Sequence, residues 1–322
     1  MTRLGKPLAA AVLALLAVAT LTAPVLPLRD PAAQPDGLVL RYLPPLSRVD
    51  LVRLSDGTSR YASEVHVDTD GSVECLRGRT WSRIPRESLS GEAPADWHRR
   101  PIFVLGTDGF GRDLLSRLVY GARVSLSVGF LAALVAVGVG GLVGLLAGTC
   151  GGVVDGLLMR AVDLFLSIPR LFLLLLLVAL YRPSLITTIL VLGGTTWMGA
   201  ARLVRGEILS LRERDFVRSA TAAGASPARV ALLHLLPGAA GPLLVEGTMR
   251  VGTSILLEAS LSFLGLGVQP PTPSWGTLIA DGRDRLLDAW WIATIPGLAI
   301  AVTVIAVSAL GDGIRVERSS AG

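Results

Sequence analysis

Long stretches without a charged residue constrain this chain more than any other feature of its sequence. The longest has 31 uncharged residues between Arg123 and Asp155, and another 23 lie between Asp288 and Asp312. A helix needs about 20 apolar residues to cross the hydrocarbon core of a bilayer. Only 17% of the 322 residues are charged, and the mean hydropathy is +0.60. A water-soluble fold is therefore excluded.

Six apolar segments approach or exceed the length of a membrane span. They are residues 7–28, 124–154, 161–181, 183–201, 238–266 and 289–311. Two of them contain charges: Asp163 and Arg170 in the third, and Glu246, Arg250 and Glu258 in the fifth. We predict an all-α polytopic membrane protein with about six transmembrane helices.

The first apolar segment has two interpretations. Arg3 and Lys6 precede it, and Ala17-Val18-Ala19 could form a signal-peptide cleavage site. The 22 uncharged residues before Arg29 are more than the roughly 7–15 expected of a signal peptide. We therefore favour a retained transmembrane anchor over residues 1–28. Either interpretation places residue 30 outside the cytoplasm.

Arginine in the short connecting segments predicts the orientation, because cytoplasmic loops carry an excess of arginine and lysine. Residues 202–229 contain six arginines, whereas Arg182 alone lies between the third and fourth segments. Arg160, Arg315 and Arg318 fall on the same side as residues 202–229 if the N-terminus is inside. Both termini are therefore predicted to be cytoplasmic.

Residues 29–101 form a long outer segment with the pattern of a small β-rich insert. Alternating residues predict strands at Leu38–Tyr42, Val49–Leu54, Val65–Val67 and Val73–Leu76. Asp56-Gly57 and Asp70-Gly71 fall between them, as hairpin turns do. Asp68 and Asp70 could also suggest calcium, but the other ligands of a calcium loop are missing. We favour the turn.

The residues of common enzymes and metal sites are poorly represented. Lys6 is the only lysine, so the chain cannot contain the GxxxxGK[ST] loop of an ATPase. Cys75 and Cys150 fall on opposite sides of the membrane in this topology, and the three histidines are far apart. The arginines are scattered, which does not favour a nucleic-acid partner. We expect no catalytic residues, no metal and no cofactor.

The segment between the fourth and fifth apolar runs predicts a helix–turn–helix. A first helix continues through Asp215 and ends at Gly224, a typical C-terminal cap. Ser226 and Pro227 then supply the cap and the first residue of a second helix over 228–236, which ends at the following Pro-Gly pair. Such a unit could dock another protein or lie on the membrane surface.

This segment resembles the EAA loop of ABC importer permeases, whose pattern is EAA-xxx-G-(nine)-I-x-LP. Arg218-Ser219-Ala220, Gly224, His234 and Leu236-Pro237 match its spacing. Arg218 replaces the glutamate and His234 replaces the isoleucine, departures typical of the dipeptide/oligopeptide/nickel branch. The segments Leu105–Arg117 and Glu258–Gly276 are similar to the same branch. The resemblance covers about residues 102–317.

The resemblance implies a permease subunit in the bacterial cytoplasmic (inner) membrane. Such a subunit is not itself an enzyme. Its implied partners are a second homologous permease, two ATP-binding ATPase subunits and an extracytoplasmic solute-binding protein. Residues 102–318 would form the permease domain, with a coupling loop over 206–238. The implied ATPase contacts are Asp215, Val217, Arg218, Ser219, Ala220, Ala223, Gly224, Ala225, Ser226 and Pro227.

The implied cargo is a di- or oligopeptide, with nickel or another chelated solute as the alternative in the same branch. A membrane-bound sensor with a ligand-binding outer insert is the alternative of another class.

The charges of the fifth segment also have two interpretations. Glu246 and Arg250 form either a structural pair or part of a pathway or subunit interface, and Glu258 could line either. Gly140, Gly144 and Gly148 repeat every four residues, which predicts close helix packing.

Overall fold

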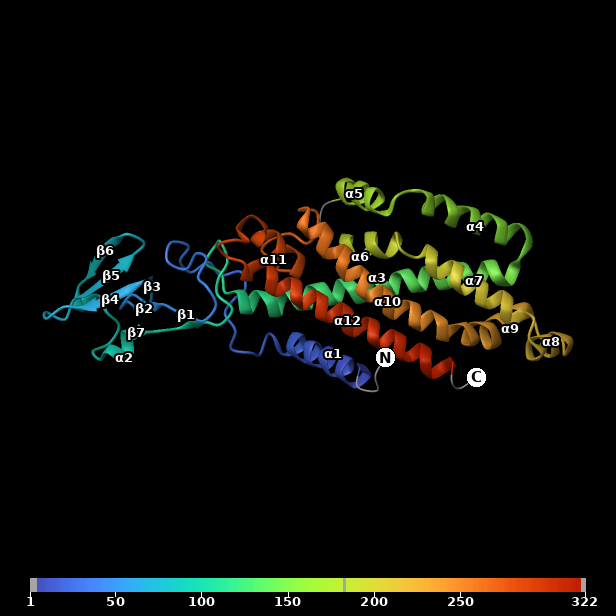
Figure 1. Ribbon diagram of the computed structural model, residues 1–322, viewed down its shortest axis with the longest axis horizontal. Coiled ribbons are helices and arrows are strands. Elements are labelled where there is room, and N and C mark those ends of the chain that lie inside the picture. Colours follow the sequence, from blue (N-terminus) through green and yellow to red (C-terminus); the bar gives the residue numbers. More distant parts are fainter. Residues whose placement is uncertain (1–4, 182–183, 320–322) are drawn as a thin grey trace.

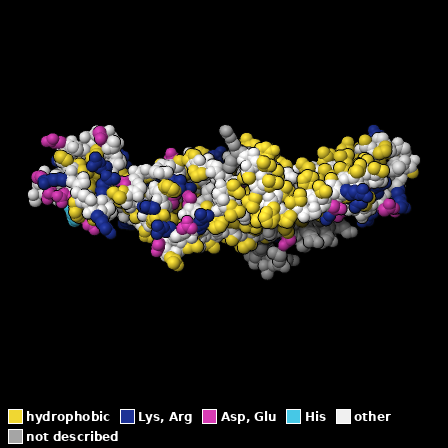
Figure 2. All heavy atoms as spheres, turned by 90° about the horizontal axis from the view of Figure 1, so that it is seen from above, with side chains coloured by type: hydrophobic (Ala, Val, Ile, Leu, Met, Phe, Trp, Pro, Cys, Tyr) yellow, Lys and Arg dark blue, Asp and Glu magenta, His cyan; other side chains and the backbone are white. Residues whose placement is uncertain are grey.

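The computed structural model describes residues 5–181 and 184–319 of the chain. Arg3 and Arg182 lie outside the described residues, and the side-chain surroundings of Arg315 and Arg318 are outside them too. The molecule is elongated, with the strands at one end and a helical bundle over the remainder (Figure 1). On the face shown in Figure 2, hydrophobic side chains cover the middle and charged side chains gather toward the two ends.

The insert contains three small antiparallel sheets. The first pairs β1 (Ser47–Arg48) with β8 (Ile102–Phe103), the second has the order β3-β2-β7, and the third has the order β4-β5-β6. Their strands are β2 (Asp50–Arg53), β3 (Ser59–Ala62), β4 (Glu64–Val67), β5 (Val73–Arg77), β6 (Thr80–Ile84) and β7 (His98–Arg99). Two short helices complete the insert, η1 (Arg86–Ser88) and α2 (Pro94–Trp97). Val52, Val73, Cys75 and Trp97 are buried in its core.

Three of the four predicted strands are present as β2, β4 and β5. Both Asp-Gly turns connect hairpins, with φ of 84° at Gly57 and 79° at Gly71. Asp70 closes its own turn by accepting a hydrogen bond from the Ser72 amide at 2.9 Å. The predicted strand at Leu38–Tyr42 is wrong, because that segment forms turns and Tyr42 has a φ of 55°.

The helices of the bundle follow the predicted apolar segments, but fewer than six of the described ones are long and apolar enough to span a membrane on their own. Among the described residues, three helical stretches are long and apolar enough to cross a membrane: Leu114–Cys150, Pro227–Phe263 and Trp291–Ile314. A fourth is obtained if α4 (Gly152–Ser167) and α5 (Arg170–Leu180), which are bent by 88°, count as one. The three long stretches correspond to α3, to α9 with η2 and α10, and to α12. With the remaining helices, the elements of the bundle are α1 (Gly5–Thr22), α3 (Leu114–Cys150), α6 (Leu185–Gly194), α7 (Met198–Arg212), α8 (Asp215–Ala222), α9 (Pro227–Val230), η2 (Ala231–Leu235), α10 (Leu236–Phe263), α11 (Trp275–Gly282), η3 (Arg283–Arg285) and α12 (Trp291–Ser319).

Local breaks explain why the described residues support three or four spans where the sequence predicts six. The third segment is interrupted before Pro169, because proline disfavours a helical conformation in the residue that precedes it. The fourth segment ends as a helix at Gly194 and turns through Thr195, whose amide bonds the Val191 carbonyl at 3.1 Å. Neither break removes apolar residues, so hydropathy alone does not reveal it.

Helix α3 lies in the middle of the bundle and packs against α7, α10 and α6 (Figure 1). The predicted glycine face makes the contact with α7. A Cβ atom added to Gly144 would lie 2.5 Å from the Ala201 carbonyl oxygen and 2.8 Å from the Val204 Cβ. Gly140 and Gly148 approach α7 in the same way, so the prediction of close packing is confirmed.

We predict that Gly144→Val destabilises the protein by about 1–3 kcal/mol, because overpacking separates two tightly apposed helices. Gly138→Val is the matched control, since Gly138 lies on the same helix with nothing within 4 Å of an added Cβ. Thermal unfolding of both variants in detergent measures the difference. Equal melting temperatures would contradict the close contact.

Candidate functional site

The short helix α8 lies at the end of the molecule opposite the strands (Figure 1). Its C-terminal end has the predicted cap. Gly224 has a φ of 85°, a left-handed conformation that favours glycine. The Gly224 amide bonds the Thr221 carbonyl at 3.0 Å, and the Ala225 amide bonds the Ala220 carbonyl at 3.1 Å. The chain thereby turns sharply and presents a compact end to its surroundings.

The second helix of this unit begins as predicted but does not end as predicted. The Ser226 hydroxyl accepts a hydrogen bond from the Arg229 amide at 3.4 Å, and Pro227 is the first helical residue. The predicted end at Pro237 is wrong, because the helix continues to Phe263. Proline lacks an amide hydrogen, and the π-helical turn η2 directly before Pro237 changes the hydrogen-bond register there.

Val217 anchors α8 to the bundle. Its side chain is 4% exposed and belongs to a buried apolar cluster with Val230, Leu235, Ile208 and Leu145. Val217 is among the predicted partner contacts; it is buried in this cluster and also lines the groove beside α8. Leu145 belongs to α3, so this cluster joins α8 to the central helix of the bundle.

The other predicted coupling residues are accessible. Ala220 and Ala225 are half-buried, and the following are exposed: Asp215, Arg218, Ser219, Ala223, Gly224, Ser226 and Pro227. Phe216, which the sequence analysis did not include, is 50% exposed and its ring centroid lies 6.2 Å from that of His234. Its position beside the buried Val217 on one helix is the signal that could have identified it.

A groove of about 620 Å³ separates α8 from the C-terminal ends of α3 and α7. Thr149, Arg212, Val217, Arg218, Ala222 and Leu235 are among its lining residues. An exposed ion pair of 2.5 Å holds Arg218 beside Glu213. The groove therefore has an apolar floor and a charged rim, which suits a partner side chain with an apolar body.

The charged residues of α10 bind to other parts of the same chain. Glu246 and Arg250 form the predicted pair, with 2.6 Å between Glu246 Oε1 and Arg250 Nη2. Arg250 also donates a hydrogen bond to the Thr196 carbonyl oxygen. The pair thus fastens α10 to the turn between α6 and α7.

Glu258 is the centre of a buried polar contact between three helices. It is 0% exposed and accepts hydrogen bonds from Ser262 at 2.7 Å and Ser125 at 3.1 Å. The Ser125 hydroxyl accepts a further hydrogen bond from the Trp275 amide at 3.1 Å, which brings in α11. Because its side chain has no exposed surface, this conformation favours a structural role for Glu258 over contact with a pathway or another subunit.

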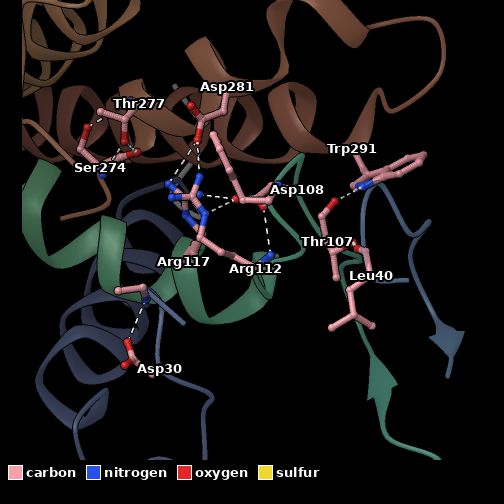
Figure 3. Close-up of polar contacts among 12 residues, drawn as sticks. Asp30, Leu40, Thr107, Asp108, Arg112, Arg117, Ser274, Thr277, Asp281 and Trp291 are labelled. Carbon is pink, nitrogen blue, oxygen red and sulfur yellow. Dashed lines mark hydrogen bonds and ion pairs between the residues drawn. The ribbon is translucent and has the colours of Figure 1, made fainter. Parts of the chain in front are cut away.

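An outer ion cluster joins α11 to the start of α3 (Figure 3). We use this name for Asp108, Arg112, Arg117 and Asp281. Asp108 accepts hydrogen bonds from Arg112 Nε at 2.7 Å and from Arg117, and Asp281 lies 3.0 Å and 3.2 Å from the same two guanidinium groups. Burial raises the pKa of the Asp281 carboxyl, although Arg117 and Arg112 oppose that rise. None of these four residues matches a sequence motif with a known role, although four charges in so apolar a chain are a signal.

Within residues 5–181 and 184–319, no group of three or more His, Cys, Asp or Glu side chains is arranged to hold a metal ion. The polar contacts described above are made by helix caps, ion pairs and hydroxyl groups. Their arrangement fixes helices relative to one another and leaves the surface of α8 accessible to a partner.

We predict that Glu258→Leu lowers the free energy of unfolding by about 1–3 kcal/mol, because two buried hydroxyl groups lose their acceptor. Glu258→Gln keeps an acceptor oxygen and serves as the control. Unfolding of both purified variants in detergent measures the difference. A leucine variant as stable as the glutamine variant would overturn the structural role of Glu258.

Comparisons with known proteins all point to membrane components of transport systems. The family described as "Binding-protein-dependent transport system inner membrane component" matches residues 140–316. The di/tripeptide transport system permease protein DppC of Pseudomonas aeruginosa is 42% identical over 213 residues, which cover 66% of this chain and 70% of that protein. The dipeptide transport system permease protein DppC of Escherichia coli is 46% identical over 225 residues, which cover 69% and 75%.

A solved structure has a similar fold. It is the inward-facing MetNI methionine ABC transporter, matched with a TM-score of 0.53 and 20% identity over 63% of this chain and 97% of that chain.

Proposed function

Because the chain belongs to the binding-protein-dependent transport system inner membrane components, we propose that it is the permease subunit of an ATP-driven importer of di- and oligopeptides. The two permeases named above, at 42% and 46% identity, carry di- and tripeptide transport in their names. Those names favour peptides over nickel or another chelated solute. The permease itself is not an enzyme in this proposal.

One observation supports the coupling role most directly: α8 is exposed around a groove while Val217 ties it to the central helix α3. A partner that binds α8 therefore acts on α3 through packed side chains. We infer that two separate ATPase subunits dock at α8 of this chain and at the equivalent helix of a second homologous permease. The Asp215–Pro227 surface is the contact we assign to this chain, with Phe216 added to it.

The mechanism requires two arrangements of the helices. ATP-driven closure of the ATPase subunits displaces α8, and the buried apolar cluster that contains both Val217 and Leu145 passes that displacement to α3. The helices then alternate between inward- and outward-facing arrangements, each favoured by a different set of contacts. An extracytoplasmic solute-binding protein delivers the peptide to the outward-facing arrangement.

We also propose a topology of six spans in the lipid bilayer, in which α1 and the α6–α7 segment add to the longer helices. The domains are an anchor over 1–28, an outer insert over 29–101 and a permease domain over 102–318 with the coupling loop at 206–238. One contact and one feature of the overall shape support placing both termini on the same, cytoplasmic side. Lys6 lies against Gly313, where an added Cβ would be 2.7 Å from the lysine Cε, and α8 and the insert lie at opposite ends (Figure 1).

We predict that Gly224→Arg reduces recovery of the ATPase subunits with the purified permease about tenfold, equivalent to ~1.4 kcal/mol of binding. The substitution adds a bulky side chain to the docking surface at a φ that disfavours it. Gly206→Arg, an equally open glycine on α7, and Gly224→Asn, which tolerates the left-handed conformation, are controls. Undiminished recovery together with ATP-dependent peptide uptake by Gly224→Arg would contradict the docking role.

A further inference from the structure

The outer ion cluster divides into a fixed part and a part that can separate. Asp108, Arg112 and Arg117 all lie within the ten residues 108–117, and Asp281 comes from α11 (Figure 3). Asp108 Oδ1 also accepts amide hydrogen bonds from Phe110 at 2.8 Å and Arg112 at 3.0 Å. Asp108 therefore holds both arginines in place through contacts within its own segment.

The stem of the insert, which we define as residues 36–46, fixes this segment from the other side. The Thr107 hydroxyl donates to the Leu40 carbonyl and accepts from the Leu43 amide at 2.8 Å. The Tyr42 amide donates to the Asp108 carbonyl at 3.1 Å. The arginines thus belong to one hydrogen-bonded body made of the stem, residues 105–113 and the first turns of α3.

A second body faces it. Helix α11 packs tightly on the start of α12, because an added Cβ on Gly282 would lie 2.8 Å from the Ala293 amide nitrogen. Several contacts tie α11 and the start of α12 to the first body. Asp281 binds the two arginines, Trp291 Nε1 donates to the Thr107 carbonyl at 3.2 Å, and Trp275 Nε1 donates to the Leu118 carbonyl at 3.0 Å. Leu114 of α3 also shares a buried apolar cluster with these helices, so Asp281 is one of several contacts between the two bodies. Asp281 is 31% exposed, whereas its arginine partners are almost completely buried. Water can therefore replace the arginines at Asp281 more readily than at Asp108.

We propose that Asp281 is the releasable half of a latch that holds the outer ends of α11 and α12 on the start of α3. The latch keeps the extracytoplasmic side closed until the loaded solute-binding protein docks. When the two bodies separate, Arg112 and Arg117 stay on Asp108, so the buried charges are never left without a partner. This inference rests on the proposed importer function and assigns Asp281 as a positioning residue for it.

The test uses the complete importer, with both permeases and both ATPase subunits, in proteoliposomes. ATP hydrolysis is measured without and with the solute-binding protein loaded with a mixture of di- and tripeptides, and uptake of a labelled dipeptide is measured in parallel. Asp281→Asn weakens the latch and Asp281→Glu keeps its charge. Asp284→Asn is the matched control, because the Asp284 side chain is 82% exposed and contacts Arg283.

We expect Asp281→Asn to raise ATP hydrolysis without the binding protein roughly fivefold or more, in the range of ordinary coupling energies. Stimulation by the loaded binding protein falls correspondingly, while Asp281→Glu and Asp284→Asn behave like the wild type. If Asp281→Asn does not reach the membrane, the double variant Arg112→Gln/Asp281→Asn restores local neutrality and carries the same expectation.

The outcomes separate the latch from the importer function. A wild-type complex that imports dipeptide, with Asp281→Asn indistinguishable from Asp284→Asn, overturns the latch alone. A wild-type complex that imports no peptide overturns the proposed function and the latch with it. Absence of both the single and the double variant from the membrane shows that the cluster serves folding only, which also overturns the latch.

Discussion

The close approach of α7 to α3 is the contact on which the rest of the membrane domain depends. It exists because Gly140, Gly144 and Gly148 leave no side chain between the two backbones, an arrangement that membrane helices use to gain packing energy. Helix α7 consequently runs beside α3 to its inner end. The turn after α7 then brings α8 to the end of the bundle, where Val217 and Leu145 join one buried apolar cluster.

Helix α3 therefore connects the two sides of the molecule. Arg117, in its first turns, is held by the outer ion cluster, and Ser125 contacts Glu258 and the start of α11. At the other end, Leu145 belongs to the same buried cluster as Val217, and Thr149 lines the groove beside α8. One helix thus contacts both the candidate latch and the candidate ATPase surface, and the proposed mechanism uses it as the connection between them.

Features that depend on a few neighbouring residues could be predicted from the sequence. The Gly224 cap, the Asp-Gly hairpin turns and the glycine face of α3 follow from local geometry and spacing. Features that depend on distant residues could not be predicted in this way. Ser125 and Glu258 are 133 positions apart, and the burial of Val217 requires α3 and α10 to be in place. The 88° bend between α4 and α5 could not be predicted from hydropathy, because a hydropathy value depends on composition and contains no information on the direction of the chain.

The most direct measurement is uptake by a bacterial strain from which this gene has been deleted, with a labelled dipeptide and labelled nickel supplied separately. The proposed importer function predicts a selective loss of dipeptide uptake, restored by the intact gene. Unchanged dipeptide uptake with loss of nickel uptake would contradict the peptide assignment and move the permease to another cargo. Unchanged uptake of both would show that neither solute is its cargo.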